Sequence, residues 1–291
     1  MKDINERDKK SFNGLTPTEW ASLSKNVWDD VSSPREPYQK EHGATYPIAL
    51  ADRIIRMYSN EGDIVFDPFV GVGTTVTSAY RQRRSGIGIE LDEKFFTIAN
   101  GVLKREKANF FDKEGGKLFH VIYNDDCRNL KKYLKESSIQ LTFTSPPYAN
   151  FIQRSLKDRQ KVHKTSLIKY ANNSTVKQYS QKAEDFGNLD YPDFLKEVKK
   201  ILIDNLQVTK IGGYSVWVVK DYRDTKNKIP YIDFHSDLAS VGKEAGWYYH
   251  DLIIWNQNFQ RRLVLLGYPS VFYTNQNCSF IVILRKPYYN G

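Results

Sequence analysis

The sequence is poor in the residues that build disulfide-bonded or metal-binding proteins. It contains two cysteines, Cys127 and Cys278, without a CxxC pair, and five histidines without an HExxH or similar spacing. These absences argue against a disulfide framework, a zinc ribbon and any bound metal. No apolar run reaches membrane-spanning length, and the polar stretch 1–20 lacks the apolar core of a signal peptide. We therefore expect a soluble, cytoplasmic protein with reduced thiols.

Positive charge and aromatic residues are abundant instead. Lysine and arginine number 43 against 34 acidic residues, a formal net charge of +9, and there are 19 tyrosines and 16 phenylalanines. A basic surface favours a polyanionic partner, and aromatic faces in a basic groove stack nucleobases. Ordinary solubility charge remains the alternative, so composition favours a nucleic-acid partner without identifying a reaction.

Strand-like and helix-like segments alternate along most of the 291 residues. This alternation predicts parallel βαβ units, and hence an α/β fold with a seven-stranded, doubly wound, mostly parallel, Rossmann-like sheet. The expected strands are 63–69, 85–91, 118–124, 141–144, 212–221, 248–255 and 278–286. The expected helices are 46–55, 74–83, 92–106, 191–207 and 234–247, with a further short helix near "TPTEW".

Two regions fall outside this pattern. Residues 1–35 form a polar N-terminal lead-in, and residues 36–291 form the expected catalytic domain. Within that domain, 149–187 is basic, polar and poorly periodic, which predicts an inserted loop or small subdomain.

The stretch "FDPFVGVGTTVTSAY" places Gly71 and Gly73 between a strand and a helix. Glycine there permits a sharp turn and close approach of a ligand, beside unpaired N–H groups at the helix start. A dinucleotide fingerprint would need a third glycine where Val76 stands, and no GKS or GKT sequence is present. Glu90, at the next strand end, is suited to ribose hydroxyls. The loop therefore indicates an adenosine-containing ligand without a pyrophosphate, with a purely structural turn as the alternative.

Asp126 follows the third expected strand, in "NDDCRNL". A carboxylate there could accept a hydrogen bond from an adenine amino group. It could equally cap the helical segment that begins at "RNLKKYL". Both interpretations are open on local grounds, but the acids at three successive strand ends, Asp67, Glu90 and Asp125–Asp126, favour the ligand role.

"DPFVGVGTT" followed by "TSPPY" resembles the S-adenosylmethionine-dependent DNA amino-methyltransferases, the N4-cytosine and N6-adenine enzymes. "EHGATYPIALADRII", "GGYSVWVVKDYR", "GWYYHDLIIWNQN" and "FIVILRK" agree, so the collinear likeness covers about 36–286 in pieces. The cofactor motif precedes the SPPY motif, an order that resembles the gamma group. The resemblance implies S-adenosylmethionine as cofactor and double-stranded DNA as partner, at the prokaryotic nucleoid.

The resemblance also implies roles for individual residues. The catalytic motif would be Ser145, Pro146, Pro147 and Tyr148. The cofactor-binding residues would be Tyr46, Pro47, Asp67, Phe69, Gly71, Gly73, Thr74, Thr75, Glu90, Leu91, Asp126 and Cys127.

Methyl transfer to an exocyclic amine needs hydrogen-bond acceptors that are held in a rigid turn. An exocyclic amine is a poor nucleophile because its lone pair is delocalised into the ring, and acceptors around its N–H groups favour the tetrahedral nitrogen of the transition state. The Ser145 hydroxyl and the Pro146 carbonyl would serve, and Tyr148 would stack on a base flipped out of the duplex.

Two alternatives do not fit the sequence. Carbon-5 cytosine methylation would need a cysteine after a proline, but Cys127 follows Asp126 and Cys278 follows Asn277. Protein-glutamine methyltransferases typically carry asparagine where Ser145 stands. A non-catalytic DNA-binding subunit would not need the intact motifs. Ser145 favours N4 of cytosine, with N6 of adenine as the runner-up. The enzyme would belong to a restriction–modification system, with a cognate restriction endonuclease as a possible partner.

DNA contact would fall to the 149–187 insert or to the stretch 256–277, because no large target-recognition domain follows "FIVILRK". Arginine and lysine contact phosphates and make affinity dependent on salt. The candidate phosphate contacts are Arg154, Lys157, Arg159, Lys161, Lys164, Arg261 and Arg262.

Overall fold

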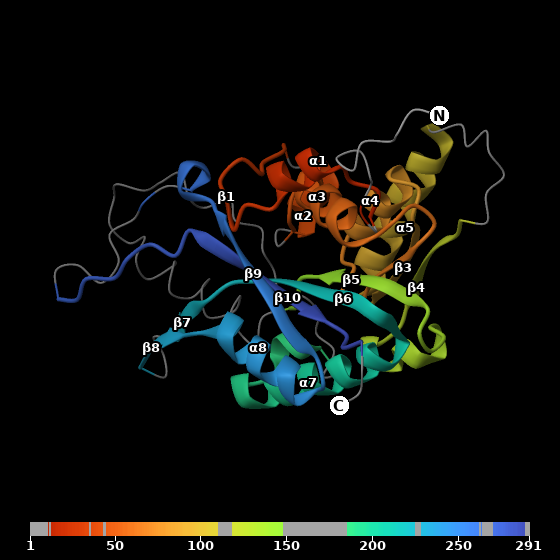
Figure 1. Cartoon of the computed structure of the whole chain (residues 1–291). Coiled ribbons are helices and arrows are strands. Elements are labelled where there is room, and N and C mark those ends of the chain that lie inside the picture. Colours follow the sequence, from red (N-terminus) through yellow and green to blue (C-terminus); the bar gives the residue numbers. More distant parts are fainter. Residues whose placement is uncertain are drawn as a thin grey trace.

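The computed structural model describes residues 11, 13–34, 36–42, 45–109, 118–147, 185–224, 228–261, 263 and 270–288. Its centre is an eight-stranded sheet with helices on both faces (Figure 1). The strand order across the sheet is β1-β9-β10-β6-β5-β2-β3-β4. The strands are β1 (Val27–Trp28), β2 (Ile64–Asp67), β3 (Ser85–Glu90), β4 (His120–Asn124), β5 (Ile139–Thr144), β6 (Thr209–Val219), β9 (Tyr248–Asn256) and β10 (Cys278–Arg285).

The strand order gives the sheet a topological switch point beside β2. From β2 the chain moves outward to β3 and β4, and then returns to β5 on the opposite side of β2. All of these strands and β6 are parallel, whereas β10 runs antiparallel between β6 and β9. In open α/β sheets, the crevice at the carboxyl ends of strands at such a switch point is the usual ligand site.

Helices cover the two faces of the sheet. The helices above the sheet in Figure 1 are α1 (Pro17–Leu23), α2 (Pro37–His42), α3 (Ile48–Tyr58), α4 (Thr74–Arg81) and α5 (Glu93–Asn109). Below it lie α7 (Tyr191–Val208) and α8 (Phe234–Glu244). Short 3₁₀ helices η2 (Cys127–Lys132), η3 (Phe186–Asn188) and η4 (Asn258–Gln260) and a hairpin of β7 (Tyr222–Asp224) and β8 (Ile229–Ile232) complete the described elements.

The alternation of side chains along each strand builds a core on each face. In β6, Val216 and Val218 join the cluster that contains Ile54 of α3, whereas Trp217 and Val219 join the cluster of α7 and α8. Successive side chains of a strand point to opposite faces, so an unbroken apolar run supplies both clusters at once. This explains why the central strands are continuous apolar segments in the sequence.

The predicted α/β fold and all seven predicted strands are confirmed, and the main sheet has one strand more than predicted. The eighth strand, β1, lies within the polar lead-in and pairs in parallel with β9, and its Trp28 is completely buried. Two residues are too short for a strand signal, so the sequence could not reveal it. The division at residue 35 stays a prediction.

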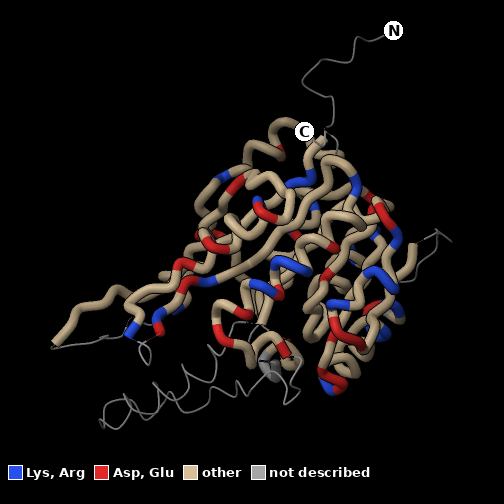
Figure 2. Tube along the Cα trace, turned by 90° about the horizontal axis from the view of Figure 1, so that it is seen from below, with Lys and Arg blue, Asp and Glu red and all other residues tan. Residues whose placement is uncertain are grey.

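Of the basic insert predicted from residue 149 onward, the structure describes the end and not the long middle part. Residues 185–187, assigned to the insert from the sequence, are buried at the start of η3. The remainder, 149–184, lies outside the described residues; its sequence holds eight lysines or arginines and two acidic residues. Within the described part, acidic and basic residues are interspersed in the view of Figure 2. Most of the net positive charge therefore belongs to the insert sequence.

No described helix is both long enough and apolar enough to cross a membrane.

Candidate active site

A cavity lies at the carboxyl edge of the sheet, at the switch point between β2 and β5. Its volume, including the part that is open to solvent, is about 840 Å³. Gly71 of the glycine loop and Ser145, Pro146 and Pro147 of the SPP turn all line it. The two short motifs, more than 70 residues apart in the sequence, therefore face one another across a single space.

The glycine loop is held to the end of β3 by Glu90. The N–H of Gly71 donates to Oε2 of Glu90 at 2.8 Å, and the N–H of Asp92 donates to Oε1 at 2.9 Å. Gly71 has a positive φ of 54°, which glycine adopts without strain. Each carboxylate oxygen has a second lone pair, so Glu90 can also accept hydrogen bonds from hydroxyls of a ligand in the cavity.

Burial dominates the ionisation of Glu90. Desolvation raises its pKa to about 8, although the backbone N–H groups of Asp92 and Gly71 act in the opposite direction. The ligand-free cavity thus holds a carboxyl group that titrates near neutral pH. A strongly shifted acid in a cleft is a mark of a functional site.

Gly73 has a different surrounding from the one the sequence indicated. It begins α4 as its N-cap with φ of 88°, and it is not among the residues that line the cavity. A Cβ atom added at Gly73 would lie 3.2 Å from the Cβ atom of Ala99 in α5. The close approach that requires a glycine here is therefore with a neighbouring helix, and the role of Gly73 in cofactor binding stays a prediction.

The buried carboxylate of Asp67 connects several elements next to the cavity. It accepts from the Thr144 hydroxyl at 2.6 Å, the Thr75 hydroxyl at 2.5 Å, the Phe69 N–H at 3.0 Å and the Tyr46 hydroxyl at 3.2 Å. Burial raises the pKa of Asp67, and these hydrogen bonds oppose the shift. Asp67 does not line the cavity. It joins the ends of β2 and β5 to α4, and so fixes the two sides of the site relative to each other.

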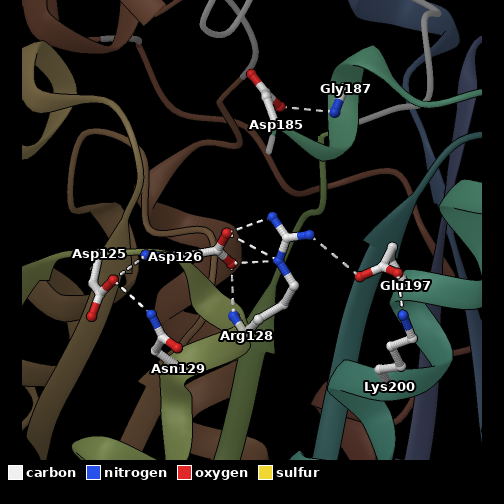
Figure 3. Close-up of polar contacts among 8 residues, drawn as sticks. All are labelled: Asp125, Asp126, Arg128, Asn129, Asp185, Gly187, Glu197 and Lys200. Carbon is white, nitrogen blue, oxygen red and sulfur yellow. Dashed lines mark hydrogen bonds and ion pairs between the residues drawn. The ribbon is translucent and has the colours of Figure 1, made fainter. Parts of the chain in front are cut away.

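Asp126 lines the cavity and also caps η2. Its Oδ1 accepts the N–H of Arg128 at 2.9 Å, and the Arg128 guanidinium forms an ion pair with its Oδ2 at 2.5 Å (Figure 3). The guanidinium carbon also lies 5.3 Å from the centre of the Phe186 ring, and Nη1 lies 3.5 Å from Glu197 of α7. Capping, one of the two roles left open from the sequence, is thus observed, and the ligand role stays a prediction.

The other predicted cofactor residues divide into two groups. Tyr46, Phe69, Thr74, Leu91 and Cys127 line the cavity. Pro47 and Thr75 do not: Pro47 is the N-cap of α3, and Thr75 is buried in contact with Asp67. The structure therefore brings most of this predicted set to one cavity and gives the others supporting positions.

Asp185 and Phe186 are among the cavity-lining residues that the sequence analysis missed. They are 4% and 3% exposed. The Phe186 ring lies 5.4 Å from the Phe69 ring, edge to face. A signal was present in "EDFGNLDYP", because an aspartate two residues before a glycine is a capping pattern, but nothing local linked it to a motif 40 residues earlier.

The remaining predicted residues lie largely outside the described part of the chain. These are Tyr148 of the catalytic motif and Arg154, Lys157, Arg159, Lys161, Lys164 and Arg262 of the DNA-contact set. Arg261 is described, follows η4 and is exposed.

A histidine between two aspartates is the one group in the described residues with a metal-like arrangement. The ligand atoms of Asp221, Asp233 and His235 lie within 4.8 Å of one another. His235 Nδ1 is 2.9 Å from Asp221 Oδ2 and 2.8 Å from Asp233 Oδ1. The ring nitrogen thus already bridges two carboxylates and ties the start of α8 to the end of β6.

Known proteins match the sequence of this chain over only part of its length. The family model described as DNA methylase, for N6 and N4 methyltransferases, matches residues 2–101. The type II methyltransferase M.BglI of Bacillus subtilis is 37% identical over 89 residues, 30% of this chain and 25% of that protein. The orphan methyltransferase M.BamHII of Bacillus amyloliquefaciens is 48% identical over 64 residues, 22% of this chain and 24% of that protein. The matched segments thus span about a quarter of the length of these curated relatives.

Among solved structures, a SAM-dependent methyltransferase of Methanosarcina mazei is 14% identical, with a TM-score of 0.47 over 81% of this chain and 98% of that one. The match to the DNA methylase family covers the first third of the chain, which includes the glycine loop. The resemblance to the S-adenosylmethionine-dependent DNA amino-methyltransferases is thereby confirmed, with residues 2–101 carrying the match to the DNA methylase family.

Proposed function

We propose that this protein is a site-specific DNA methyltransferase that moves a methyl group from S-adenosylmethionine to the exocyclic N4 of a flipped-out cytosine. The observation that carries the proposal is the shared cavity of Gly71 and the SPP turn, at the switch point of the sheet. A cofactor loop and an acceptor-rich turn that face one space can bring two reactants together, which is a large part of catalysis.

The charge of the cavity supports this cofactor. The described lining residues include four carboxylates and no lysine or arginine; the carboxylates are Glu90, Asp92, Asp126 and Asp185. A lining without lysine or arginine disfavours phosphate-bearing nucleotides, and its carboxyl groups, when ionised, favour a ligand with positive charge. S-Adenosylmethionine, when bound, supplies an electrophilic methyl group on a sulfonium cation. Glu90 would accept hydrogen bonds from its ribose, and Asp126, oriented by Arg128, would accept one from its adenine.

The SPP turn would prepare the target amine. The Ser145 hydroxyl and the Pro146 carbonyl accept hydrogen bonds from the amine and favour a tetrahedral nitrogen whose lone pair points at the methyl group. Rigidity matters here, because preorganised acceptors need no rearrangement during the reaction. The two prolines fix the backbone, and the bond from Thr144 to Asp67 anchors the strand end that precedes them.

The choice of base rests on Ser145. Serine at this position resembles the N4-cytosine enzymes, and N6-adenine methylation is the second candidate. The relatives named above as type II and orphan methyltransferases support a place in DNA modification, with a cognate restriction endonuclease as a possible partner. A DNA-binding subunit without activity is the remaining candidate, which the intact cavity disfavours.

The test is incubation with labelled S-adenosylmethionine and mixed-sequence DNA, followed by digestion to nucleosides. Label in N4-methylcytosine supports the proposal, and label in N6-methyladenine transfers it to the second candidate. Absence of label, with DNA binding retained, favours the inactive subunit. In Ser145→Ala the rate should fall by about 100-fold, the effect of losing one preorganised hydrogen-bond partner, with cofactor affinity unchanged. Tyr148→Ala should also slow turnover at unchanged cofactor affinity.

A further inference from the structure

The side-chain amide of Gln39 in α2 joins two walls of the cavity. Gln39 is 1% exposed, and its Nε2 donates to the carbonyl oxygen of Tyr46 at 3.3 Å and to the hydroxyl of Thr74 at 3.2 Å. Tyr46 precedes α3, Thr74 is the first residue of α4, and both line the cavity. One buried amide thus connects the chain before α3 to the helix that follows the glycine loop.

Other polar atoms of Gln39 hold its own segment together. We call the described residues 36–42, 45 and 46 the strap. Within it, Oε1 of Gln39 accepts from the N–H of Glu36 at 3.1 Å, and the carbonyl oxygen of Gln39 accepts from the hydroxyl of Thr45 at 3.3 Å. Thr45 also lines the cavity. Gln39 therefore contacts three cavity-lining residues, Thr45, Tyr46 and Thr74, although it does not line the cavity itself.

The end of the strap has a separate attachment to the core. The Tyr46 hydroxyl donates to Oδ2 of Asp67 at 3.2 Å, and the Tyr46 ring lies 4.9 Å from the ring of Phe143 in β5. These contacts fix the Tyr46 side chain, whereas Gln39 holds the Tyr46 carbonyl group and attaches α2 to α4. The two attachments act at different points of the strap.

A cavity wall that is fixed before the ligand arrives increases the affinity. A ligand that must order part of its own site loses binding free energy, and the apparent affinity falls with the fraction of molecules in the competent conformation. The bonds of Gln39 are present in the ligand-free protein and are buried, so removing the amide would leave buried partners without their hydrogen bonds. The amide therefore favours the strap position that the structure shows.

We propose that Gln39 is a positioning residue for the cofactor: its amide holds the strap against α4, so that Thr45, Tyr46 and Thr74 form one preorganised wall of the cavity. This inference rests on the proposed function, because it takes S-adenosylmethionine as the ligand of the cavity. It adds to that function a residue that acts only through the residues it positions.

The test is Gln39→Met in the full chain. Methionine is similar in length and can stay buried, but its side chain donates no hydrogen bond to Tyr46 or Thr74. The affinity for S-adenosylmethionine, measured by calorimetry, should fall about tenfold, with a less favourable binding entropy because the strap becomes ordered only on binding. Release of labelled cofactor should be faster. The KM for the cofactor should rise by more than kcat falls.

Gln82→Met is the matched control. Gln82 is the C-cap of α4, and its Nε2 donates to the Ser78 hydroxyl at 3.0 Å and lies 3.5 Å from Asp52 of α3. This amide also ties α4 to a neighbouring helix, but at the end of α4 away from Thr74. Gln82→Met should leave cofactor affinity within about twofold of the wild type. Urea unfolding of both ligand-free variants would show whether a difference in stability accompanies the difference in affinity.

Variants of Thr74 test the same bond from the other side. Thr74→Val removes the acceptor and should weaken cofactor binding, whereas Thr74→Ser keeps the hydroxyl and should bind within about twofold of the wild type. In the combined variant of Gln39→Met and Thr74→Val, the loss of affinity should be smaller than the product of the two single losses, because both changes remove one interaction. If Gln39→Met does not fold, the comparison of Thr74→Val with Thr74→Ser remains as the test.

The outcomes are distinguishable. A wild-type protein that does not bind S-adenosylmethionine refutes the proposed function and not the position of the strap. A wild type that binds, with Gln39→Met equal to it or with Gln39→Met and Gln82→Met weakened equally, overturns the role of Gln39. Strictly multiplicative losses in the combined variant, or equal affinities of Thr74→Val and Thr74→Ser, would also overturn it.

Discussion

The backbone N–H of Gly71 donates to the carboxylate of Glu90 at 2.8 Å, so the glycine loop after β2 and the end of β3 form one unit. Glu90 is therefore both a support of the loop and an acceptor available to a ligand. Its ionisation should therefore link ligand binding to the pH of the solution.

Cofactor affinity should rise with pH. Burial raises the pKa of Glu90 to about 8, so the ligand-free protein holds it mostly protonated at pH 7. Ribose hydroxyls that donate to Glu90 favour the carboxylate, and binding then releases a proton. The association constant for S-adenosylmethionine should increase by up to about tenfold for each pH unit below 8 and level off above it. Calorimetry in buffers of different ionisation enthalpy would detect the proton. Glu90→Gln should bind weakly and independently of pH; a pH-independent wild type would contradict this assignment.

The stability of the ligand-free protein should respond to Glu90 with the opposite sign. A carboxyl group whose folded pKa lies above its unfolded pKa favours folding while it is protonated. The free energy of unfolding should therefore fall as the pH rises from about 4.5 toward 8. Urea titrations of the wild type and Glu90→Gln across this range would check it, since the difference between the two should shrink toward low pH.

The two glycines Gly73 and Gly101 should respond in opposite directions to alanine. Gly73 has φ of 88° and faces Ala99, so Gly73→Ala should lower the free energy of unfolding by about 1–2 kcal/mol. Gly101 lies in α5 with nothing within 4 Å of an added Cβ atom, so Gly101→Ala should raise it by about 0.5–1 kcal/mol. Urea unfolding of both variants is the measurement. Equal effects would mean that helix contact is not what selects glycine at 73.

Much of the fold followed from the sequence because its signals are local. The strands of the parallel half are continuous apolar runs, and α7 carries apolar side chains at helical spacing behind a capping aspartate, Asp190. The two residues of β1 and the β7–β8 hairpin escaped notice because neither has a periodic signal of useful length. The strand order could not be read from the sequence, since the pairing of distant strands depends on tertiary packing.

The candidate site was predictable only where it coincided with motifs. The glycine loop and the SPP turn can be recognised from their residue types, and the structure brings them to one cavity. Asp185 and Phe186 belong to no motif, and only folding brings them to the same space. The case of Gly73 is subtler, because a glycine that accommodates a helix and one that accommodates a ligand look identical in a sequence.

Removing the Asp67 carboxylate should be far more costly than breaking an exposed ion pair. Asp67 accepts four hydrogen bonds at 1% exposure, so Asp67→Asn should lower the free energy of unfolding by roughly 2–4 kcal/mol. Asp30 pairs with Arg53 at 51% side-chain exposure, and Asp30→Asn should cost less than about 1 kcal/mol. Chemical denaturation would compare the two, and similar losses would show that the buried network contributes little.

Arg128 should affect cofactor binding through Asp126. Arg128→Met removes the guanidinium that orients the Asp126 carboxylate, and affinity for S-adenosylmethionine should fall about fivefold, the value of one lost hydrogen bond. Lys200 contacts Glu197 on the outer side of the same network, so Lys200→Met is the matched control and should leave affinity unchanged (Figure 3). Equal effects of both variants would indicate a general charge effect.

Chain order has a consequence for how the molecule is made. β10 comes last among the strands yet lies inside the sheet, between β6 and β9. During synthesis, both of these strands emerge from the ribosome with an unpaired edge, a template for pairing with other chains. The nascent protein can complete its sheet only once residues 278–285 have left the ribosome. A chain that ends before residue 278 should therefore be insoluble.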